Sequence, residues 1–383
     1  MFGAGLLLSC RKTPEINNTL PPPPAQPPSP PPANPPAPPI TDLHLTYFDT
    51  ISTARYNMVA GAAGSKVLFV GGFYDVPFCF YDSSDDSPGW LTCRYESNRA
   101  DIYDTITHSW TAHDLARYYY GAMTAVTADN KVFFSNGTDT AGRTWSGKVD
   151  VYDALINSWS VIQLSEPRTG TGTGSVGNKV FFAGGSIYSP GYRTSNRVDI
   201  YDVSGNTWAT AALSEARTSP MVTTAGNKII FAGGWNEHGA SDVVDIFDAS
   251  SNTWSVARLS HTGGFMTAFS IADEAFFMVG APGNRIPPPR KIDVYNSNSN
   301  NWSVREIDFF AEGYPSVVLN NRAFVFVGRT VFTYDKATGS WSKGMIDLDF
   351  GYPAIIAVGN AIYFAGGSGG GDSQTNKVWR VTP

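Results

Sequence analysis

The sequence is poor in the residues from which metal and covalent catalytic centres are usually built. Its 383 residues include only three cysteines and five histidines. The histidines are His44, His108, His113, His238 and His261. They show no spacing typical of a metal-ligand set. We therefore expect neither a metal site nor a bound cofactor.

Basic clusters, long apolar runs and long helix-forming runs are also missing. The formal net charge is −6 and the pI is about 5.4. With no basic stripe, this argues against a nucleic-acid-binding protein. No segment approaches the roughly eighteen apolar residues of a membrane-spanning helix. Aromatic residues make up 13% of the chain and there are 38 glycines, which favours β-structure with many turns.

Residues 1–41 differ in composition from the rest of the chain. Residues 21–40 read PPPPAQPPSPPPANPPAPPI, and proline offers no backbone donor to a sheet or helix. We predict an extended linker over residues 11–41, whose Pro-rich part spans roughly 60 Å at about 3.1 Å per residue. The globular domain is then expected over residues 42–383.

The first ten residues, MFGAGLLLSC, resemble the lipobox of bacterial lipoproteins, carried here by Leu7, Leu8, Ser9 and Cys10. The resemblance implies a signal segment over residues 1–10, acylation of Cys10, and a membrane-anchored place in the bacterial cell envelope. That place is periplasmic or surface-exposed. No Lys or Arg precedes the short apolar run, and a start codon assigned too late would explain this departure. A cytosolic protein with an apolar start by chance is the alternative.

Two cysteines remain besides Cys10. Cys79 and Cys93 lie in one long segment, FYDVPFCFYDSSDDSPGWLTCRYESNR, with no His or further Cys nearby to complete a metal site. An oxidising compartment would bridge them, and such a bridge would order a long loop. We predict a disulfide, and two reduced thiols are the alternative.

An apolar run followed by a glycine pair, or by its remnant, recurs at a period near fifty residues. The seven occurrences are Gly71-Gly72, Asn136-Gly137, Gly184-Gly185, Gly233-Gly234, Gly280-Ala281, Gly328-Arg329 and Gly366-Gly367. After a variable segment, a Tyr or Phe and then a Trp follow in the first six units. These tryptophans are Trp110, Trp159, Trp208, Trp254, Trp302 and Trp341.

These units resemble kelch repeats, and the resemblance covers roughly residues 42 to 383. It implies an all-β fold, a seven-bladed kelch-type β-propeller with one four-stranded sheet per repeat. The residues agree with it, because each unit divides into four short strands whose sheet would have two apolar faces and needs neighbours to bury them. The last unit lacks its Trp strand. We predict that an N-terminal strand closes the ring, with residues 43–50 pairing onto residues 376–382.

The repeat also predicts where a ligand would bind. Strands alternate in direction, so the loops between blades and the loops after the glycine pairs leave the same face. We predict a ligand-binding face formed by Arg55, Trp90, Arg168, Tyr188, Tyr192, Arg217 and Trp235. The arginines open first strands and are expected at the mouth of the central channel, where they would offer donors. The aromatic rings would stack on a sugar or fill a protein partner's pockets.

Some kelch propellers are enzymes. Copper oxidases similar to galactose oxidase need a ligand set of Tyr, His and Cys, whereas sialidases need Asp-box turns. Neither pattern is found in this sequence. An enzyme similar to the kelch mutarotase of sialic acid is the alternative that remains, and Glu312, Arg168 and Arg217 could serve it. Asp82, Asp85 and Asp86 do not have the spacing of a calcium loop and indicate a solvated acidic segment.

The sequence thus predicts an exported, lipid-anchored propeller that binds a glycan or a protein on its loop face. We expect a monomer that binds no nucleic acid and meets the membrane only through its anchor.

Overall fold

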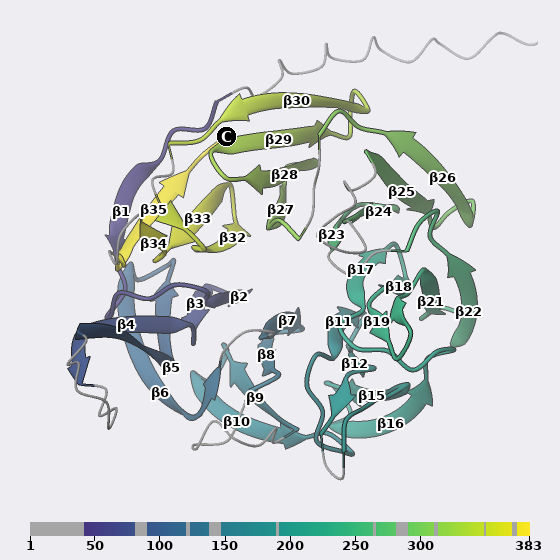
Figure 1. Ribbon diagram of the computed structural model, residues 1–383, viewed down its shortest axis with the longest axis horizontal. Coiled ribbons are helices and arrows are strands. Elements are labelled where there is room, and N and C mark those ends of the chain that lie inside the picture. Colours follow the sequence, from purple (N-terminus) through teal and green to yellow (C-terminus); the bar gives the residue numbers. More distant parts are fainter. Residues whose placement is uncertain are drawn as a thin grey trace, which may run out of the picture. The chain divides into compact units, whose positions relative to one another are not determined.

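Seven antiparallel sheets follow one another along the chain in the computed structural model, and they stand around a common centre as the blades of a β-propeller (Figure 1). The structure describes residues 42–80, 90–119, 123–137, 147–188, 191–262, 266–280, 290–309, 313–347, 350–369 and 374–383. The side chains of residues 77–80, 90–92, 119 and 350 lie outside this description. No helix occurs among the described residues. The all-β, seven-bladed prediction is confirmed.

Each blade has an inner, two middle and an outer strand. Blade 1 contains β2 (Val59–Ala63), β3 (Lys66–Val70), β5 (Trp90–Asp104) and β6 (Ser109–Tyr119). Blade 2 contains β7 (Thr124–Ala128), β8 (Lys131–Ser135), β9 (Lys148–Asp153) and β10 (Ser158–Gln163). Blade 3 contains β11 (Gly172–Val176), β12 (Lys179–Ala183), β15 (Arg197–Asp202) and β16 (Thr207–Ala212). Blades 4 and 5 contain β17 (Met221–Ala225), β18 (Lys228–Ala232), β21 (Val243–Asp248) and β22 (Thr253–Arg258); and β23 (Met266–Ile271), β24 (Glu274–Val279), β25 (Lys291–Asn296) and β26 (Asn301–Glu306). Blade 6 contains β27 (Ser316–Leu319), β28 (Arg322–Val327), β29 (Thr330–Asp335) and β30 (Ser340–Met345).

Blade 7 is built from both ends of the domain. Its strands are β32 (Ala354–Val358), β33 (Ala361–Ala365), β35 (Lys377–Val381) and, outermost, β1 (Thr46–Thr50). In the β1–β35 ladder Thr46 stands opposite Arg380 and Thr50 opposite Lys377. The predicted closure by an N-terminal strand is therefore confirmed, and it leaves the last blade with the same four strands as the others.

Short strands extend the loops of several blades. β4 (Phe73–Phe80) pairs with the first half of β5. The others form two-residue pairs: β13 (Ser186–Ile187) with β14 (Arg193–Thr194), β19 (Trp235–Asn236) with β20 (Gly239–Ala240), and β31 (Phe350–Gly351) with β34 (Ser368–Gly369).

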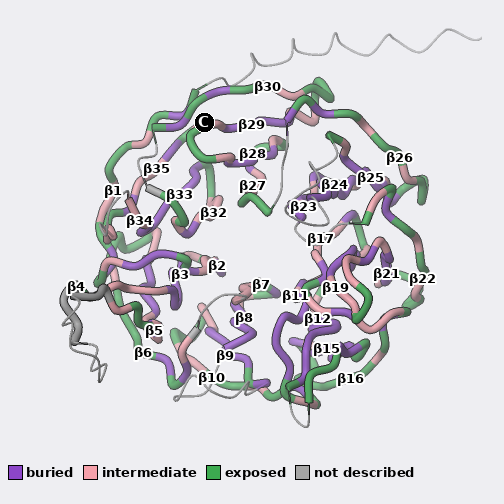
Figure 2. The backbone as a smooth tube through the Cα atoms, in the orientation of Figure 1, coloured by how far each residue is buried: buried purple, intermediate pink, exposed green. Residues whose placement is uncertain are grey.

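The burial of each strand follows its place in the blade. Four of the five residues of β18, KIIFA, are buried, as expected for a middle strand covered on both faces. The outer strand β22, TWSVAR, is largely exposed. Figure 2 shows exposed residues along the outer strands around the ring.

The core lies between the blades. Between blades 1 and 2, for example, Leu68 and Ile102 pack against Val132, Phe134 and Tyr152. Each Trp of an outer strand packs on the Tyr or Phe of the strand beside it, with ring centroids 5.1 Å apart for Tyr152 and Trp159. The repeated aromatic residues are therefore structural, and function must be sought elsewhere.

The repeated glycines allow each blade to meet the next. Gly184 has φ +67°, and a Cβ there would lie 2.3 Å from the carbonyl oxygen of Arg217 in the following blade. Gly366 has φ +64°, and its Cβ would lie 2.2 Å from the carbonyl oxygen of Arg55. Only glycine combines this conformation with so close an approach. Blade 7 thus contacts blade 1 as blade 3 contacts blade 4.

Candidate functional site

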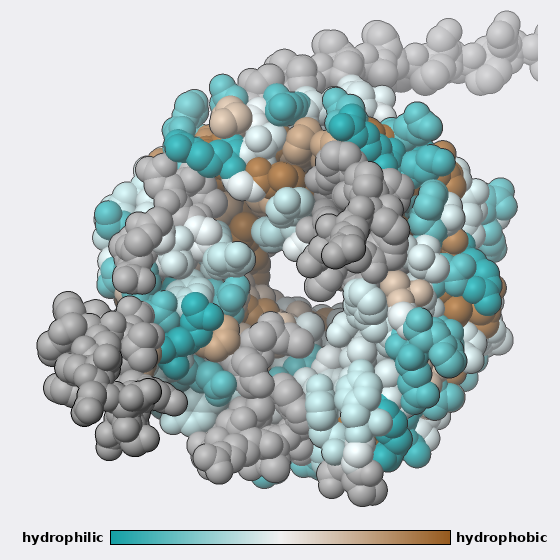
Figure 3. All heavy atoms as spheres, viewed as in Figure 1, coloured by the Kyte–Doolittle hydropathy of each residue, from teal (hydrophilic) through white to brown (hydrophobic). Residues whose placement is uncertain are grey.

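The loops of the ring divide between two faces. The segments that connect one blade to the next, and those that connect the two middle strands, leave from one face, which we call the loop face. The turn between the two inner strands and the turn between the two outer strands leave from the other, which we call the turn face. Figure 3 shows the ring with an opening at its centre.

The three predicted arginines lie inside the protein. Arg55, Arg168 and Arg217 are each at most 1% exposed. Each forms an ion pair with an Asp on the third main strand of its own blade, namely Asp101, Asp199 and Asp245. Each also donates to the carbonyl oxygen of a glycine in its own blade; the Arg168 Nη1 to Gly184 O distance is 2.7 Å. We call this arrangement the Arg–Asp latch.

The expectation that these arginines face a ligand at the channel mouth is therefore wrong. Their guanidinium groups are surrounded by protein and committed to internal partners. Burial lowers the pKa of Arg55 to about 10, and it lowers the pKa of Arg168, yet both remain charged at neutral pH. Their role is to fix the loop that enters each blade. The mutarotase-like alternative loses two of its three candidate residues, and the third, Glu312, lies outside the described residues.

A fourth latch was missed in the sequence. Arg117, near the end of β6, forms a buried ion pair with Asp150 of blade 2. It stands two residues closer to the preceding Trp than Arg168 and Arg217 do, and an alignment on the next inner strand places Tyr120 at their position instead. The repeated Asp at the third main strand was the signal that could have revealed all four pairs.

Blades 5 and 6 replace the latch. In blade 5 the carboxylate of Asp293 accepts bonds from the backbone N–H and hydroxyl of Ser260, at 3.1 and 3.0 Å. The Ser260 hydroxyl also lies 2.8 Å from Nδ1 of His261. Burial raises the pKa of Asp293. Among the described residues, no Arg forms an ion pair with this carboxylate. In blade 6 the place of the Asp is taken by Phe332, and its partner from the connecting segment is Phe309. The two rings stack with their centroids 3.7 Å apart.

The ribbon of β4 and β5 in blade 1 carries an aromatic surface. Tyr74 and Tyr95 stand opposite each other and their rings stack at a centroid distance of 5.6 Å. Tyr95 is 45% exposed. On the other side of the ribbon, Arg94 lies over the ring of Tyr56, 5.4 Å from its centroid. This surface offers both a ring face and an accessible cation.

Blade 7 supports that ribbon. The side-chain amide of Gln374 donates to the backbone oxygen of Asp75 and accepts from its N–H, at 2.8 and 2.9 Å. The Asp75 carboxylate accepts the hydroxyl proton of Tyr56 at 3.0 Å. The base of the ribbon is therefore held by two blades, so its aromatic rings are presented on an ordered support.

Two predicted residues of the ribbon can be placed only by their backbone. Trp90 begins β5 and pairs with Phe80, and Cys79 pairs with Leu91. Cys93 stands opposite Val76 on the same ladder. The two cysteines therefore lie on neighbouring antiparallel strands. The disulfide between them stays a prediction.

The predicted residues of blades 3 and 4 lie on the loop face as expected from the strand order. Tyr188 and Tyr192 are 53% and 60% exposed, and their rings form an edge-to-face pair with centroids 5.4 Å apart. Trp235 is half-buried at the start of β19, where its backbone pairs with Thr218. The chain thus has a second aromatic surface.

These surfaces do not form one site among the described residues. Figure 1 places the ribbon of β4 and β5 on one side of the ring and β19 on the other. The described residues thus show one aromatic surface on blade 1 and another on blade 3. A single site across the channel mouth stays a prediction.

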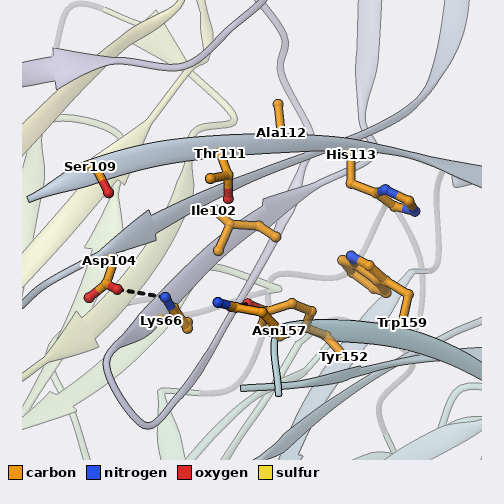
Figure 4. Close-up of a pocket in the computed structure, with 10 residues that line it drawn as sticks. All are labelled: Lys66, Ile102, Asp104, Ser109, Thr111, Ala112, His113, Tyr152, Asn157 and Trp159. Atoms are coloured by element: carbon orange, nitrogen blue, oxygen red, sulfur yellow. Dashed lines mark hydrogen bonds and ion pairs between the residues drawn. The ribbon is translucent and has the colours of Figure 1, made fainter. Parts of the chain in front are cut away.

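Two pockets lie beside the outer strand of blade 1. One, of about 280 Å³, lies between blades 1 and 2, and Figure 4 shows its ion pair of Lys66 and Asp104 and the parallel rings of His113 and Trp159. The other, of about 430 Å³, lies between blades 7 and 1 and includes Asp49 and Trp110. Neither is lined by a residue of the predicted ligand-binding face.

The part of the chain that the structure describes contains no group of three or more His, Cys, Asp or Glu placed to hold a metal. It also contains no helix long and apolar enough to cross a membrane. Four of the five histidines contact different side chains: His44 lies beside Asp347, His108 beside Tyr103, His113 beside Trp159 and His261 beside Ser260.

Comparisons with known proteins agree with the fold. Residues 167–212 and 216–258, which include the main strands of blades 3 and 4, match the Kelch motif. No curated protein matches the sequence. A solved structure described as "Structure of YjhT" is similar with a TM-score of 0.51 at 14% identity, over 68% of this chain and 93% of that chain. At that identity the likeness concerns the fold alone. The protein is a seven-bladed β-propeller with kelch motifs.

Proposed function

We propose that the protein is a binding module of the bacterial cell envelope that recognises a glycan or protein ligand with the aromatic surfaces of its loop face. The observation that carries the proposal is the exposed pairing of aromatic rings on blades 1 and 3. Rings of the repeat pack inside the blades, whereas Tyr95, Tyr188 and Tyr192 do not belong to the repeat and face solvent. A soluble domain has no structural reason to expose such pairs, and flat rings bind sugars and peptide side chains well.

Blade 1 is the stronger of the two surfaces. The exposed Arg94 lies beside Tyr56 and 3.4 Å from the Asp75 carboxylate, on the opposite side of the ribbon from the Tyr74 and Tyr95 rings. An Arg held in this way can bind a carboxylate or a pair of sugar hydroxyls. The ligand class that fits is an acidic or hydroxyl-rich glycan, or a peptide with equivalent groups.

The binding proposal predicts an effect of single ring truncations. Tyr95→Ala and Tyr192→Ala should each weaken binding by on the order of tenfold or more, because a central aromatic contact contributes about 2 kcal/mol. Glycan arrays would identify a ligand, and calorimetry with that glycan would measure affinity. Tyr47→Ala is the matched control, since Tyr47 is equally exposed but lies on β1 at the outer edge of blade 7.

Two results would decide against it. Unchanged affinity in both variants, with loss of affinity in Tyr47→Ala, would place the site elsewhere. Conversion of one sugar anomer to the other at a rate above the uncatalysed one, abolished by a loop-face variant, would replace the binding function by the mutarotase-like alternative.

The proposed place in the cell follows from the lipobox-like segment, which lies outside the described residues. If Cys10 carries lipid, the wild-type protein should fractionate with membranes and Cys10→Ala should move most of it to the soluble fraction. Metabolic labelling with a fatty-acid analogue checks the modification itself. A wild-type protein that is soluble and unlabelled, made from the verified start codon, would contradict the anchor.

A further inference from the structure

Among the described residues, the large exposed aliphatic side chains of the turn face lie on two adjacent blades. Ile106 in blade 1 and Leu155 and Ile156 in blade 2 are 76%, 73% and 71% exposed. All three belong to the turns between the two outer strands. The positions equivalent to Ile106 and Leu155 in blades 3 to 6 hold Ser204, Ser250, Asn298 and Ala337.

The backbone of these turns is the same whatever the side chain. The N–H of Ile106 donates to Oδ1 of Asp104 at 2.9 Å, and that of Leu155 to Asp153 at 3.0 Å. The polar turns form the same bond, at 2.8 Å from Ser250 to Asp248. The turn can therefore be made with a small polar residue, so nothing in its fold requires an exposed aliphatic one.

The two apolar turns are neighbours. The pocket between blades 1 and 2 is lined by Asp104 and Ser109, which flank Ile106, and by Asn157, which follows Ile156 (Figure 4). Residues of both apolar turns thus line one pocket between the two blades. We call Ile106, Leu155 and Ile156 the apolar tips.

We propose that the apolar tips insert into the surface of a lipid bilayer, so that the propeller rests on a membrane with its turn face and points its loop face away. Membrane contact by the turn face does not depend on the proposed function. Only the statement that the loop face is left free to bind a ligand rests on it. It adds a second membrane contact to any lipid on Cys10.

Area and shape favour a bilayer over a protein partner. A stable protein interface buries roughly 1,200 Å² or more in total, which three side chains on two turns do not approach. Turns project outward, and projecting aliphatic side chains can enter the boundary between headgroups and acyl chains without a complementary groove.

Charge determines which bilayer is expected. The lysines nearest the tips are already paired, Lys66 with Asp104 at 2.6 Å and Lys131 with Asp153. These ion pairs add no net charge, so insertion should not require anionic lipid. The Lys66–Asp104 pair also borders the pocket between the tips, so polar groups should stay at headgroup level while only the tips enter.

The test uses the full chain with Cys10→Ala, so that acylation cannot anchor it, and vesicles of phosphatidylcholine and phosphatidylethanolamine. The parent should float with the vesicles, and the variant I106S/L155S/I156S should have a vesicle partition coefficient lower by on the order of tenfold or more. Binding should be little changed between about 0.1 and 0.5 M NaCl, because it does not depend on surface charge. The matched control is V256S/V304S/M345S, which removes three exposed aliphatic side chains from outer strands of blades 4 to 6 and should bind as the parent does.

Three results would overturn the proposal. They are a parent that does not float, a tip variant that floats as well as the parent, and a control variant that loses binding equally. If the tips instead support self-association in light scattering, lost in the tip variant while vesicles are ignored, the surface is a protein interface. Glycan affinity measured in the same variants should not change, so failure of this proposal and failure of the proposed function remain distinguishable.

Discussion

Asp199→Asn is expected to destabilise the protein by about 3–5 kcal/mol, because it removes the buried counter-charge of the Arg168 guanidinium and leaves only the more exposed Glu166 carboxylate, 3.9 Å from Nε. The side chains of this pair are 0% and 2% exposed, so water cannot replace the lost carboxylate. The amide of Asn can still accept a hydrogen bond, but it does not balance the charge. The latch of blade 3 would then hold a buried cation whose only remaining counter-charge is the more distant Glu166 carboxylate.

Asp293→Asn is expected to change the free energy of unfolding in the opposite direction, although Asp293 occupies in blade 5 the position that Asp199 occupies in blade 3. No described Arg pairs with this carboxylate, and its bonds from Ser260 can be kept by an amide. Burial raises the pKa of Asp293, so the folded state favours the protonated form. His261 and Lys291 act in the other direction but do not outweigh burial. At neutral pH the variant should therefore be equally stable or more stable.

The pH dependence of the same pair follows from the raised pKa. A folded-state pKa above the ordinary value of 3.8 means that the folded protein holds this proton more tightly than the unfolded chain does. The stabilising contribution is then complete below the ordinary value and is lost as the pH rises through the folded pKa. The advantage of Asp293→Asn over wild type should grow over that window and then level off.

Denaturant unfolding of the wild type and both variants, from about pH 4 to pH 8, measures these differences. Equal destabilisation by both substitutions would show that a cation compensates Asp293 as Arg168 compensates Asp199. Destabilisation by neither would mean that the latches do not contribute as buried ion pairs.

Much of the fold could be predicted because the signal was repeated. The glycine pairs, the Tyr or Phe and the Trp recur in order, and each has a backbone or packing reason that holds in every blade. Closure of the ring was predictable as well, since the last unit lacked one strand and residues 42–52 could supply it.

Alignment of the arginines across the units does not by itself show that they are buried. One repeat position is occupied by arginine in three units, as Arg55, Arg168 and Arg217. The Asp of the strand VDIYD recurs as well. The reasoning that makes the recurring Gly and Trp structural residues applies equally to these recurring charged residues. Their pairing spans 31 residues in the case of Arg168 and Asp199, so no local pattern shows it. A charged residue without a visible partner was taken as exposed.

The exposed aromatic pairs were only partly predictable. Sequence order places Tyr188, Tyr192 and Trp235 in loops of the correct face, but it does not tell a ring that faces solvent from one that covers the core. Trp235 is half-buried, whereas Tyr188 and Tyr192 are exposed. The apolar tips carry a sequence signal that was overlooked, because Ile106 and Leu155 stand where the other repeats have small or polar residues.

Removal of the closing strand should have the largest effect on the fold. β1 is the outer strand of blade 7, and its surroundings belong to two blades: the ring of Phe48 lies 5.3 Å from that of Tyr363 in blade 7 and 5.2 Å from that of Tyr103 in blade 1. Leu43 and Ile51, on either side of β1, are both 2% exposed. Asp49 accepts the indole N–H of Trp110 at 2.8 Å. The strand therefore links the first and last blades by packing, hydrogen bonds and the ladder to β35.

Deletion of residues 1–52 should thus prevent cooperative folding, whereas deletion of residues 1–40 should leave the melting temperature unchanged. The first removes the buried Leu43 and Ile51, each worth about 2–5 kcal/mol, and the half-buried Phe48, from a fold whose whole stability is expected to be about 5–15 kcal/mol. It also exposes the edge of β35, which invites aggregation. Phe48→Ala alone should cost about 3 kcal/mol, while Tyr47→Ala, whose side chain points to solvent from the adjacent position, should cost little. Equal melting temperatures for the two truncations, or equal costs for the two point variants, would mean that the ring holds without its closing strand and that the glycine contacts between blades 7 and 1 suffice.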